Sequence, residues 1–235
     1  EENFKNKVVI VSTVQFLNSL EKLKQLMPEK LIFPQSKPLH KTEVLGCTAP
    51  SLGDVDVLSV ADGRFHLEAV MIQNPHLRNR FFKFDPFQQK LTKEFFAFEE
   101  LEEKRQIEIE KSKSTKIAVI ILGTLGRQGN ENILQRLENL LKKNEKKFCT
   151  FLLSELSPNL LNSLKDEVAF FVQICCPRLS LDWGSSYDVP LLTPFECFSL
   201  FDQKDQNQNQ TKMKMKMHPM DNYASNGGPW SNYYS

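Results

Sequence analysis

The chain has 235 residues, of which 40% are hydrophobic, and its 30 Lys and Arg residues nearly balance its 29 Asp and Glu residues. The formal net charge of +1 argues against a broad nucleic-acid-binding surface, and no apolar run reaches the roughly 18 residues of a membrane-spanning helix. Five scattered cysteines without a C-x-x-C pair do not form a secreted disulfide framework, so we expect a cytoplasmic protein.

Strand and helix patterns alternate in the first part of the chain. Apolar runs predict short buried strands at 7–13, 30–33 and 56–61. Apolar residues at helical spacing predict a helix at 14–27, and the aromatic-rich stretch 81–91 predicts a small antiparallel hairpin. The charged stretch 92–116 predicts a solvated helix that connects two domains. Residues 1–110 therefore form an expected α/β lobe with a parallel sheet.

The same plan repeats in the second part of the chain. Apolar runs predict buried strands at 116–122, 148–153 and 168–174. Helical patterns at 130–143 and 158–164 separate these strands, so residues 111–202 form a second expected α/β lobe. The two lobes share an architecture and not a sequence. Each is expected to be a small parallel sheet flanked by helices.

The character of the sequence changes after the second lobe. Residues 203–218 are rich in Gln, Asn, Lys and Met, have no core-forming pattern and are predicted to be disordered. Aromatic residues return in the tail at 219–235, which we expect to dock on the body. The chain lacks an initiator methionine and opens close to a strand, which indicates a piece of a longer protein.

Two cysteines follow the most apolar strand. Cys175, Cys176, Pro177 and Arg178 come directly after the run 168–174, where proline ends a strand. Ligands of open parallel sheets bind beyond the carboxyl ends of the strands, so a thiol followed by a guanidinium is well placed for binding. The ordinary role of a single cysteine is a small buried hydrophobe. We interpret the other two cysteines of this lobe, at 149 and 197, as core residues.

A series of motifs resembles the diphthamide-synthesis family. In chain order they lie at 34–39, 43–48, 62–68, 122–130, 153–155, 173–184, 219–221 and 228–230. Proteins of this family have three homologous α/β domains, each of which gives one cysteine to a single iron–sulfur cluster. The resemblance is to the second and third domains, and it maps the cluster ligands to Cys47 and Cys176, with Cys175 in the place of an alanine. The first domain and its cysteine are expected to lie outside this sequence.

The resemblance implies the first step of diphthamide biosynthesis. Three cysteines on a [4Fe–4S] cluster leave one iron open to S-adenosylmethionine, whose cleavage gives a 3-amino-3-carboxypropyl radical. The radical adds to a histidine of translation elongation factor 2. Further implied partners are a paralogous second subunit and a small electron-donor protein, with neither nucleic acid nor membrane. With two ligands, the 235-residue chain alone is expected to be inactive and to hold little or no stable cluster.

An alternative is a non-catalytic subunit that supports the catalytic chain of the same complex. Such partners typically lack the complete cysteine set, so the presence of both Cys47 and Cys176 favours the catalytic type. We expect their sulfur atoms to converge within roughly 10 Å, as cluster ligands must. Cys175 is expected to point into the core of the second lobe, because adjacent strand residues face opposite sides.

Other polar residues allow two interpretations. Gln128, Arg178 and Asp182 either bind S-adenosylmethionine or form a structural salt bridge and a capped turn. The glycine-rich loop 123–129 lacks the Lys-Ser/Thr pair of a P-loop, so nucleotide hydrolysis is not expected. His66 lies in a D-G-R-F-H-L-E motif and is interpreted as a hydrogen-bonded structural residue, with metal ligation as the alternative.

Overall fold

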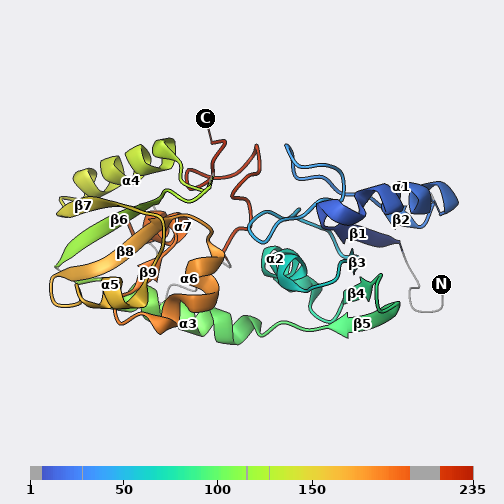
Figure 1. Ribbon diagram of the computed structural model, residues 1–235, viewed down its shortest axis with the longest axis horizontal. Coiled ribbons are helices and arrows are strands. Elements are labelled where there is room, and N and C mark those ends of the chain that lie inside the picture. The colour runs from blue at the N-terminus through green and yellow to red at the C-terminus, as the bar shows by residue number, and fades with distance from the viewer. Residues whose placement is uncertain (1–6, 28, 115, 127, 202–217, 235) are drawn as a thin grey trace. The chain divides into compact units, whose positions relative to one another are not determined.

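The computed structural model describes residues 7–27, 29–114, 116–126, 128–201 and 218–234 (Figure 1). The chain divides into two compact units, and each is described by itself. The first unit contains the chain up to Phe98 and the segments Met217–Gly228 and Tyr233–Ser235, and the second contains Glu99–Lys216 and Pro229–Asn232. The division lies at the start of a charged helix, twelve residues before the expected boundary at 110, because that helix buries side chains in the second unit. Most of the predicted segment 203–218 lies outside the described residues.

The first unit has a five-stranded sheet in the order β2-β1-β3-β4-β5. Its strands are β1 (Val8–Ser12), β2 (Leu31–Ile32), β3 (Asp56–Val60), β4 (Phe81–Asp85) and β5 (Lys90–Glu94). All pairs are parallel except β4 with β5, which confirms the expected hairpin. All five residues of β1 are buried, as befits a strand with parallel neighbours on both sides.

Two α-helices flank the first sheet. Helix α1 (Leu17–Leu26) follows a 3-10 turn at Val14–Phe16, and α2 (Phe65–Gln73) precedes another at Pro75–Leu77. Phe16 and Leu20 pack with Ile10 and Val60 in one buried cluster. The crossovers β1-α1-β2 and β3-α2-β4 run in opposite directions along the sheet. Because such crossovers are right-handed, the two helices cover opposite faces.

The second unit has a four-stranded parallel sheet in the order β7-β6-β8-β9. Its strands are β6 (Ile117–Gly123), β7 (Phe148–Leu153), β8 (Val168–Ile174) and β9 (Leu191–Leu192). Its helices are α3 (Phe98–Lys111), α4 (Glu131–Lys143), α5 (Pro158–Asn162), α6 (Arg178–Trp183) and α7 (Pro194–Phe201), with a 3-10 turn at Gly184–Ser186. All seven residues of β8 are buried, as the apolar run predicts.

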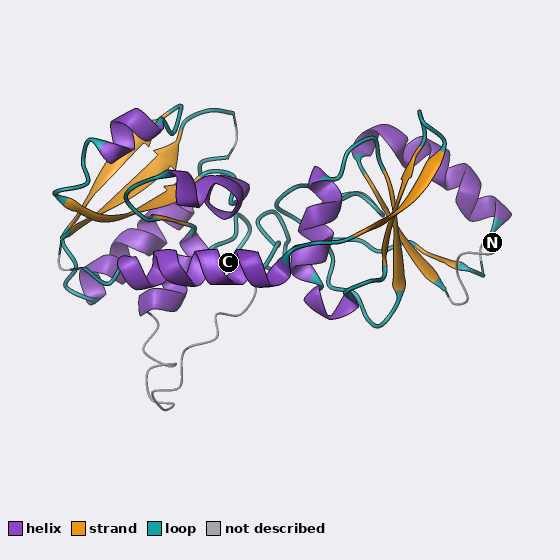
Figure 2. Cartoon of the chain, turned by 90° about the horizontal axis from the view of Figure 1, so that it is seen from below, coloured by secondary structure: helices purple, strands orange, loops and turns teal. Residues whose placement is uncertain are grey.

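Helices pack on both faces of the second sheet (Figure 2). Helices α4 and α7 contribute to one buried cluster through residues such as Leu137 and Cys197, and α5 contributes Leu161 to the other. Asn130 caps the start of helix α4, and its side chain accepts hydrogen bonds from the backbone N–H groups of Asn132 and Ile133. This cap starts the helix directly after the glycine-rich loop.

The two sheets share one strand order. In each, the first strand lies between the second and the third, and a fourth follows the third, giving β2-β1-β3-β4 and β7-β6-β8-β9. The predicted α/β fold with two lobes built on one plan is confirmed. Among the residues that the structure describes, no helix is both long enough and apolar enough to cross a membrane.

The cysteines outside the two ligand positions behave differently from one another. Cys197 is fully buried, as predicted. The interpretation of Cys149 as a core residue is wrong, because β7 is an edge strand and the side chain is exposed. Cys175 was predicted to point into the core of the second unit, and this prediction is wrong. Cys175 lies beyond the end of β8, half-buried, with its sulfur against the backbone of Gly123.

Candidate functional site

Cys47 lies at the tip of a tight turn in the first unit. The backbone N–H of Leu45 donates to the carbonyl of Thr48 over 2.9 Å, and the reverse bond measures 3.3 Å. The turn is attached to the carboxyl end of β1, because the N–H of Val44 donates to the carbonyl of Ser12 over 3.0 Å. This is the sheet edge at which ligands of parallel α/β folds bind. Cys47 itself is buried.

A close approach fixes the residue before Cys47. A Cβ atom at Gly46 would lie 2.1 Å from Cε1 of Phe65, the first residue of α2. A side chain at this position would therefore require the ring of Phe65 or the turn to move. The D-G-R-F-H-L-E motif thus shapes the cysteine turn by packing.

The returning C-terminal segment, residues 218–228, pairs with the same turn. The N–H of Asn222 donates to the carbonyl of Cys47 over 3.1 Å, and the N–H of Ala49 donates to the carbonyl of Met220 over 2.8 Å. These bonds form an antiparallel bridge between Thr48 and Asp221. The turn that presents Cys47 is therefore built from two segments that are distant in the sequence.

Cys176 lies between the end of β8 and the start of α6 in the second unit. Gln173, fully buried in β8, donates from Nε2 to the carbonyl of Cys176 over 3.0 Å and to Oγ of Ser180 over 2.9 Å. The half-buried sulfur accepts a hydrogen bond from the backbone N–H of Arg178 and lies against that of Leu179, which also donates to the Cys176 carbonyl over 3.0 Å. The buried glutamine therefore holds the backbone at the cysteine, while the helix start faces its sulfur.

The charge state of Cys176 follows from opposing effects. Burial raises the pKa of the Cys176 thiol above its ordinary value and outweighs the backbone N–H of Arg178 and its guanidinium, which lower it. The thiol is consequently protonated near neutral pH. A metal would bind the thiolate and release this proton, and the same N–H groups would then stabilise the ligand.

Two of the residues predicted to bind S-adenosylmethionine form an ion pair. Nε of Arg178 lies 2.8 Å and 2.9 Å from the two carboxylate oxygens of Asp182, one helical turn away. Arg178 is buried, and the pair is a salt bridge within α6. Gln128 is exposed on the loop, and among the described residues its side chain makes no hydrogen bond.

The charged residues of the D-G-R-F-H-L-E motif also have structural partners. Nε of Arg64 lies 2.9 Å from the carboxylate of Glu68, and Nη1 lies 3.0 Å from that of Glu94. Gln15 donates to Asp62 over 3.2 Å. These contacts join α2 to β5 and to the turn before α1, so Arg64 and Glu68 help to hold these elements together.

The donor chemistry of the two cysteines fits iron–sulfur ligation. Cys47 receives a hydroxyl hydrogen bond from Thr48 with an oxygen–sulfur distance of 3.8 Å, and Cys176 receives backbone N–H groups. Donors of this kind stabilise thiolates, which are the ligands of such clusters. Among the described residues, no three His, Cys, Asp or Glu side chains gather closely enough to hold a metal ion. Each unit contains one of the two predicted ligands.

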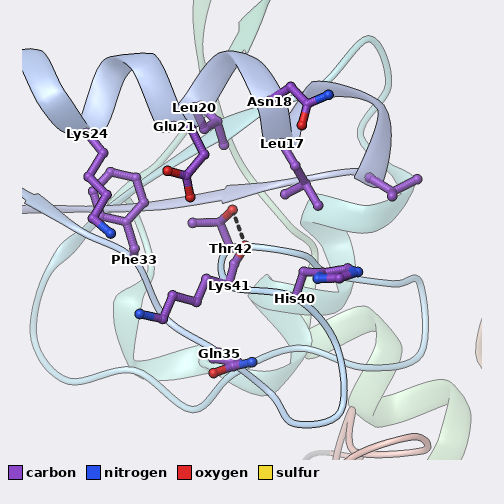
Figure 3. A pocket seen from close by; sticks show the side chains of 11 residues that line it. Leu17, Asn18, Leu20, Glu21, Lys24, Phe33, Gln35, His40, Lys41 and Thr42 are labelled. Carbon is purple, nitrogen blue, oxygen red and sulfur yellow. Dashed lines mark hydrogen bonds between the residues drawn. The ribbon is translucent and has the colours of Figure 1, made fainter.

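Pockets open on the surface of the first unit, and two of them are distinguished by their linings. One of about 570 Å³ lies between α1 and the segment 33–42, with Lys24, Phe33 and Lys41 in its lining (Figure 3). No residue predicted to bind the cluster or the cosubstrate lines it, so we assign it no part in the site. The other, of about 520 Å³, lies beside the Cys47 turn, with Ala49 and Asp221 in its lining.

Comparison with known proteins decides the family. The model of the family described as "Putative diphthamide synthesis protein" matches residues 1–212. The chain belongs to the diphthamide synthesis family. The match extends over most of both units and includes the positions of Cys47 and Cys176.

The similar proteins include enzymes and solved structures of this family. The 2-(3-amino-3-carboxypropyl)histidine synthase subunit 1 of Dictyostelium discoideum is 41% identical over 98% of this chain and 50% of its own length. That of Caenorhabditis elegans is 40% identical over 99% of this chain and 59% of its own. The crystal structure of Dph2 from Pyrococcus horikoshii with a 4Fe-4S cluster superimposes with a TM-score of 0.68 at 19% identity, covering 93% of this chain and 63% of that one. The chain spans about half the length of the curated relatives it matches.

Sequence reasoning gave no role to two residues that shape the cysteine positions. Gln173 is a polar residue inside an apolar run, which was a usable signal, since a buried amide needs partners. Thr48 directly follows Cys47, but its partner in the returning segment lies 175 residues away and no local pattern indicates it.

Proposed function

We propose that this chain forms the second and third domains of the catalytic subunit for the first step of diphthamide biosynthesis. The reaction is the transfer of a 3-amino-3-carboxypropyl group from S-adenosylmethionine to a histidine of translation elongation factor 2. The supporting observation is that each unit presents one cysteine at the carboxyl end of its sheet, with hydrogen-bond donors on its sulfur. These are the two thiols expected of the second and third domains.

In this proposal Cys47 and Cys176 are two of three ligands of a [4Fe–4S] cluster, and the third cysteine belongs to a first domain outside this sequence. When bound, the cluster would supply an open iron for S-adenosylmethionine and the electron that cleaves its sulfonium bond. The protein's own task is to hold the two thiolates and exclude water from them. Arg178 serves Cys176 with its backbone N–H and positive charge, and its guanidinium is fixed by Asp182.

The cosubstrate and the partners also belong to the proposal. Gln128, Arg178 and Asp182 are proposed to contact S-adenosylmethionine. Gln128 has an exposed amide to offer, and the Asp182 carboxylate remains partly exposed beside the buried guanidinium. The partners are elongation factor 2 as substrate, a paralogous subunit and a small electron-donor protein, all in the cytoplasm.

A second candidate is a supporting, non-catalytic subunit of the same complex. It is favoured by the observation that the described residues hold no group of three metal-binding side chains. It predicts that neither cysteine is needed for bound iron, whereas the catalytic proposal requires both.

Anaerobic iron and sulfide reconstitution tests the proposal. We expect the 235-residue chain to retain little iron, and a protein that also carries the first domain to retain four irons and modify elongation factor 2. Cys47→Ala and Cys176→Ala in the longer protein should abolish both iron retention and activity. Cys149→Ala, which changes an exposed thiol on an edge strand, should leave both unchanged. Full iron binding in Cys176→Ala would contradict the assignment.

A further inference from the structure

The hydroxyl of Thr48 links the returning segment to the sulfur of Cys47. Thr48 is fully buried, and its Oγ1 accepts a hydrogen bond from the backbone N–H of Tyr223 over 2.9 Å. The same hydroxyl donates to Sγ of Cys47 over 3.8 Å. A backbone N–H can only donate, so Tyr223 occupies a lone pair of Oγ1 and leaves the hydroxyl hydrogen for the sulfur. The two hydrogen bonds therefore run in one direction, from the Tyr223 amide to the Thr48 hydroxyl and from that hydroxyl to the Cys47 sulfur.

The position of the Tyr223 amide is fixed on both sides of Thr48. Hydrogen bonds from Asn222 to Cys47 and from Ala49 to Met220 form an antiparallel bridge. Met220 is buried, and its N–H donates to Oε1 of Gln73 over 2.6 Å. Backbone hydrogen bonds therefore hold this segment in a fixed position on the first unit.

The segment also closes on itself. The N–H of Gly228 donates to Oδ2 of Asp221 over 3.2 Å, and the N–H of Ser225 donates to the carbonyl of Lys37 over 2.7 Å. The first bond closes the segment into a loop, and the second holds it against the first unit. Loss of Asp221 should therefore loosen the residues that place the Tyr223 amide.

A hydrogen bond to a ligand sulfur has a known electronic effect. Donors to the sulfur atoms of an iron–sulfur cluster stabilise the more negative, reduced state and raise the reduction potential. A thiolate is a stronger acceptor than a thiol, so the contact should shorten when Cys47 carries charge. The hydroxyl of Thr48 is placed to exert this effect on one ligand only.

We propose that Thr48 is a positioning residue that tunes Cys47 as an iron ligand, and that the returning segment 218–228 sets the Thr48 hydroxyl through the amide of Tyr223. The inference rests on the proposed function, in which Cys47 binds iron. It assigns the C-terminal segment a part in the cluster site although it contributes no ligand.

The first experiment measures the reduction potential of the reconstituted protein, with its first domain, by an electron paramagnetic resonance titration. We expect Thr48→Val to shift the potential to a more negative value and Thr48→Ser, which keeps the hydroxyl, to restore it. The matched control is Ser12→Ala, which removes a fully buried hydroxyl that donates to the carbonyl of Val60 over 2.8 Å. This control should lower stability without moving the potential.

A second experiment does not need the cluster. In the metal-free 235-residue chain, iodoacetamide labelling followed by mass spectrometry reports the exposure of each thiol. We expect Asp221→Ala to speed labelling of Cys47 at least several-fold, with labelling of the buried Cys197 unchanged. Equal Cys47 rates in the two proteins would overturn the role of the segment.

The outcomes separate the two proposals. If the unmodified longer protein binds no cluster, the proposed function fails, and the labelling result still reports on the segment. If it binds a cluster and Thr48→Val has an unchanged potential, the tuning role of Thr48 is wrong while the proposed function stands. A potential shifted equally by Ser12→Ala would also overturn it, because the effect would then follow any lost buried hydroxyl.

Discussion

The guanidinium of Arg105 and the carboxylate of Glu196 form a bidentate ion pair inside the second unit. Nε to Oε1 and Nη2 to Oε2 both measure 2.7 Å, and both side chains are buried. Arg105 also donates to the carbonyls of Ser180 and Leu191. Burial opposes the charge of Arg105, but Glu196 outweighs it, so the pKa of Arg105 lies above its ordinary value. The pair thereby ties α3 and α7 to α6, the helix that follows Cys176.

Removing one partner of this pair should destabilise the second unit strongly. Arg105→Met leaves the Glu196 carboxylate buried without its counter-ion, so we expect a loss of about 3–5 kcal/mol in the free energy of unfolding. Urea unfolding followed by tryptophan fluorescence reports this unit, because both tryptophans, Trp183 and Trp230, belong to it.

Two further variants test the origin of that loss. The double variant Arg105→Met, Glu196→Leu should recover most of the lost stability, because neither charge is then left buried. Lys104→Ala, which breaks an exposed pair with Glu100 on the same helix, should have no measurable effect. An Arg105→Met protein as stable as the parent would show that the pair is not formed in solution.

The turn that carries Cys47 should not tolerate a side chain at Gly46. The added Cβ of Gly46→Ala would overlap the ring of Phe65, so the ring, the turn or α2 must move. We expect a cost of about 1–3 kcal/mol and faster hydrogen exchange in peptides covering residues 43–49. Gly63→Ala is the matched control, because a Cβ there meets no atom within 4 Å. Equal exchange in both variants would contradict the packing argument.

The elements that the sequence predicted best are those with the clearest burial. The strand β8 was placed from its apolar run, and all seven of its residues are buried. Helix α4 was placed from its apolar spacing, and Asn130 caps it within one residue of the expected start. Cys149 was misplaced because its strand pattern does not reveal that β7 lies at the sheet edge, where one face is open.

The candidate site depends on contacts between distant segments, and these set the limit of sequence reasoning. The positions of Cys47 and Cys176 came from family motifs, since no local spacing relates them. The bonds that place them join Thr48 to Tyr223 and Arg105 to Glu196, which are 175 and 91 residues apart. Such pairings arise from how the chain folds back on itself, and periodicity does not encode them.

Alkaline pH should weaken the second unit through Cys197. Burial raises the pKa of the Cys197 thiol far above its ordinary value, so the folded state keeps the proton that the unfolded state loses above about pH 8.5. The free energy of unfolding is therefore unaffected by this thiol below that pH, and above it falls by about 1.4 kcal/mol per pH unit. Unfolding free energies of the parent and Cys197→Ala, measured from pH 7 to 10, should differ in slope. Parallel pH profiles would contradict this prediction.

The amide of Gln173 should matter more for Cys176 than for stability. Gln173→Leu removes the hydrogen bonds from Nε2 to the Cys176 carbonyl and to Ser180. The same change also removes Oε1, a buried atom that has no hydrogen-bond partner among the described residues, and this removal favours the folded state. The Cys176 carbonyl keeps one hydrogen bond, from the N–H of Leu179 over 3.0 Å. The two effects partly offset, so we expect a loss of only about 1 kcal/mol in the free energy of unfolding.

The local effect of the same variant should be larger. Without the amide, the backbone between β8 and α6 is held less firmly, so iodoacetamide should label Cys176 several-fold faster in the metal-free chain. Cys149, exposed on the edge strand of the same unit, provides the internal control, because nothing around it changes. A several-fold increase at Cys176 with an unchanged rate at Cys149 would show that Gln173 positions the cysteine. Equal acceleration of both would instead indicate general loosening of the unit, and no change at either would show that α6 holds Cys176 without the glutamine.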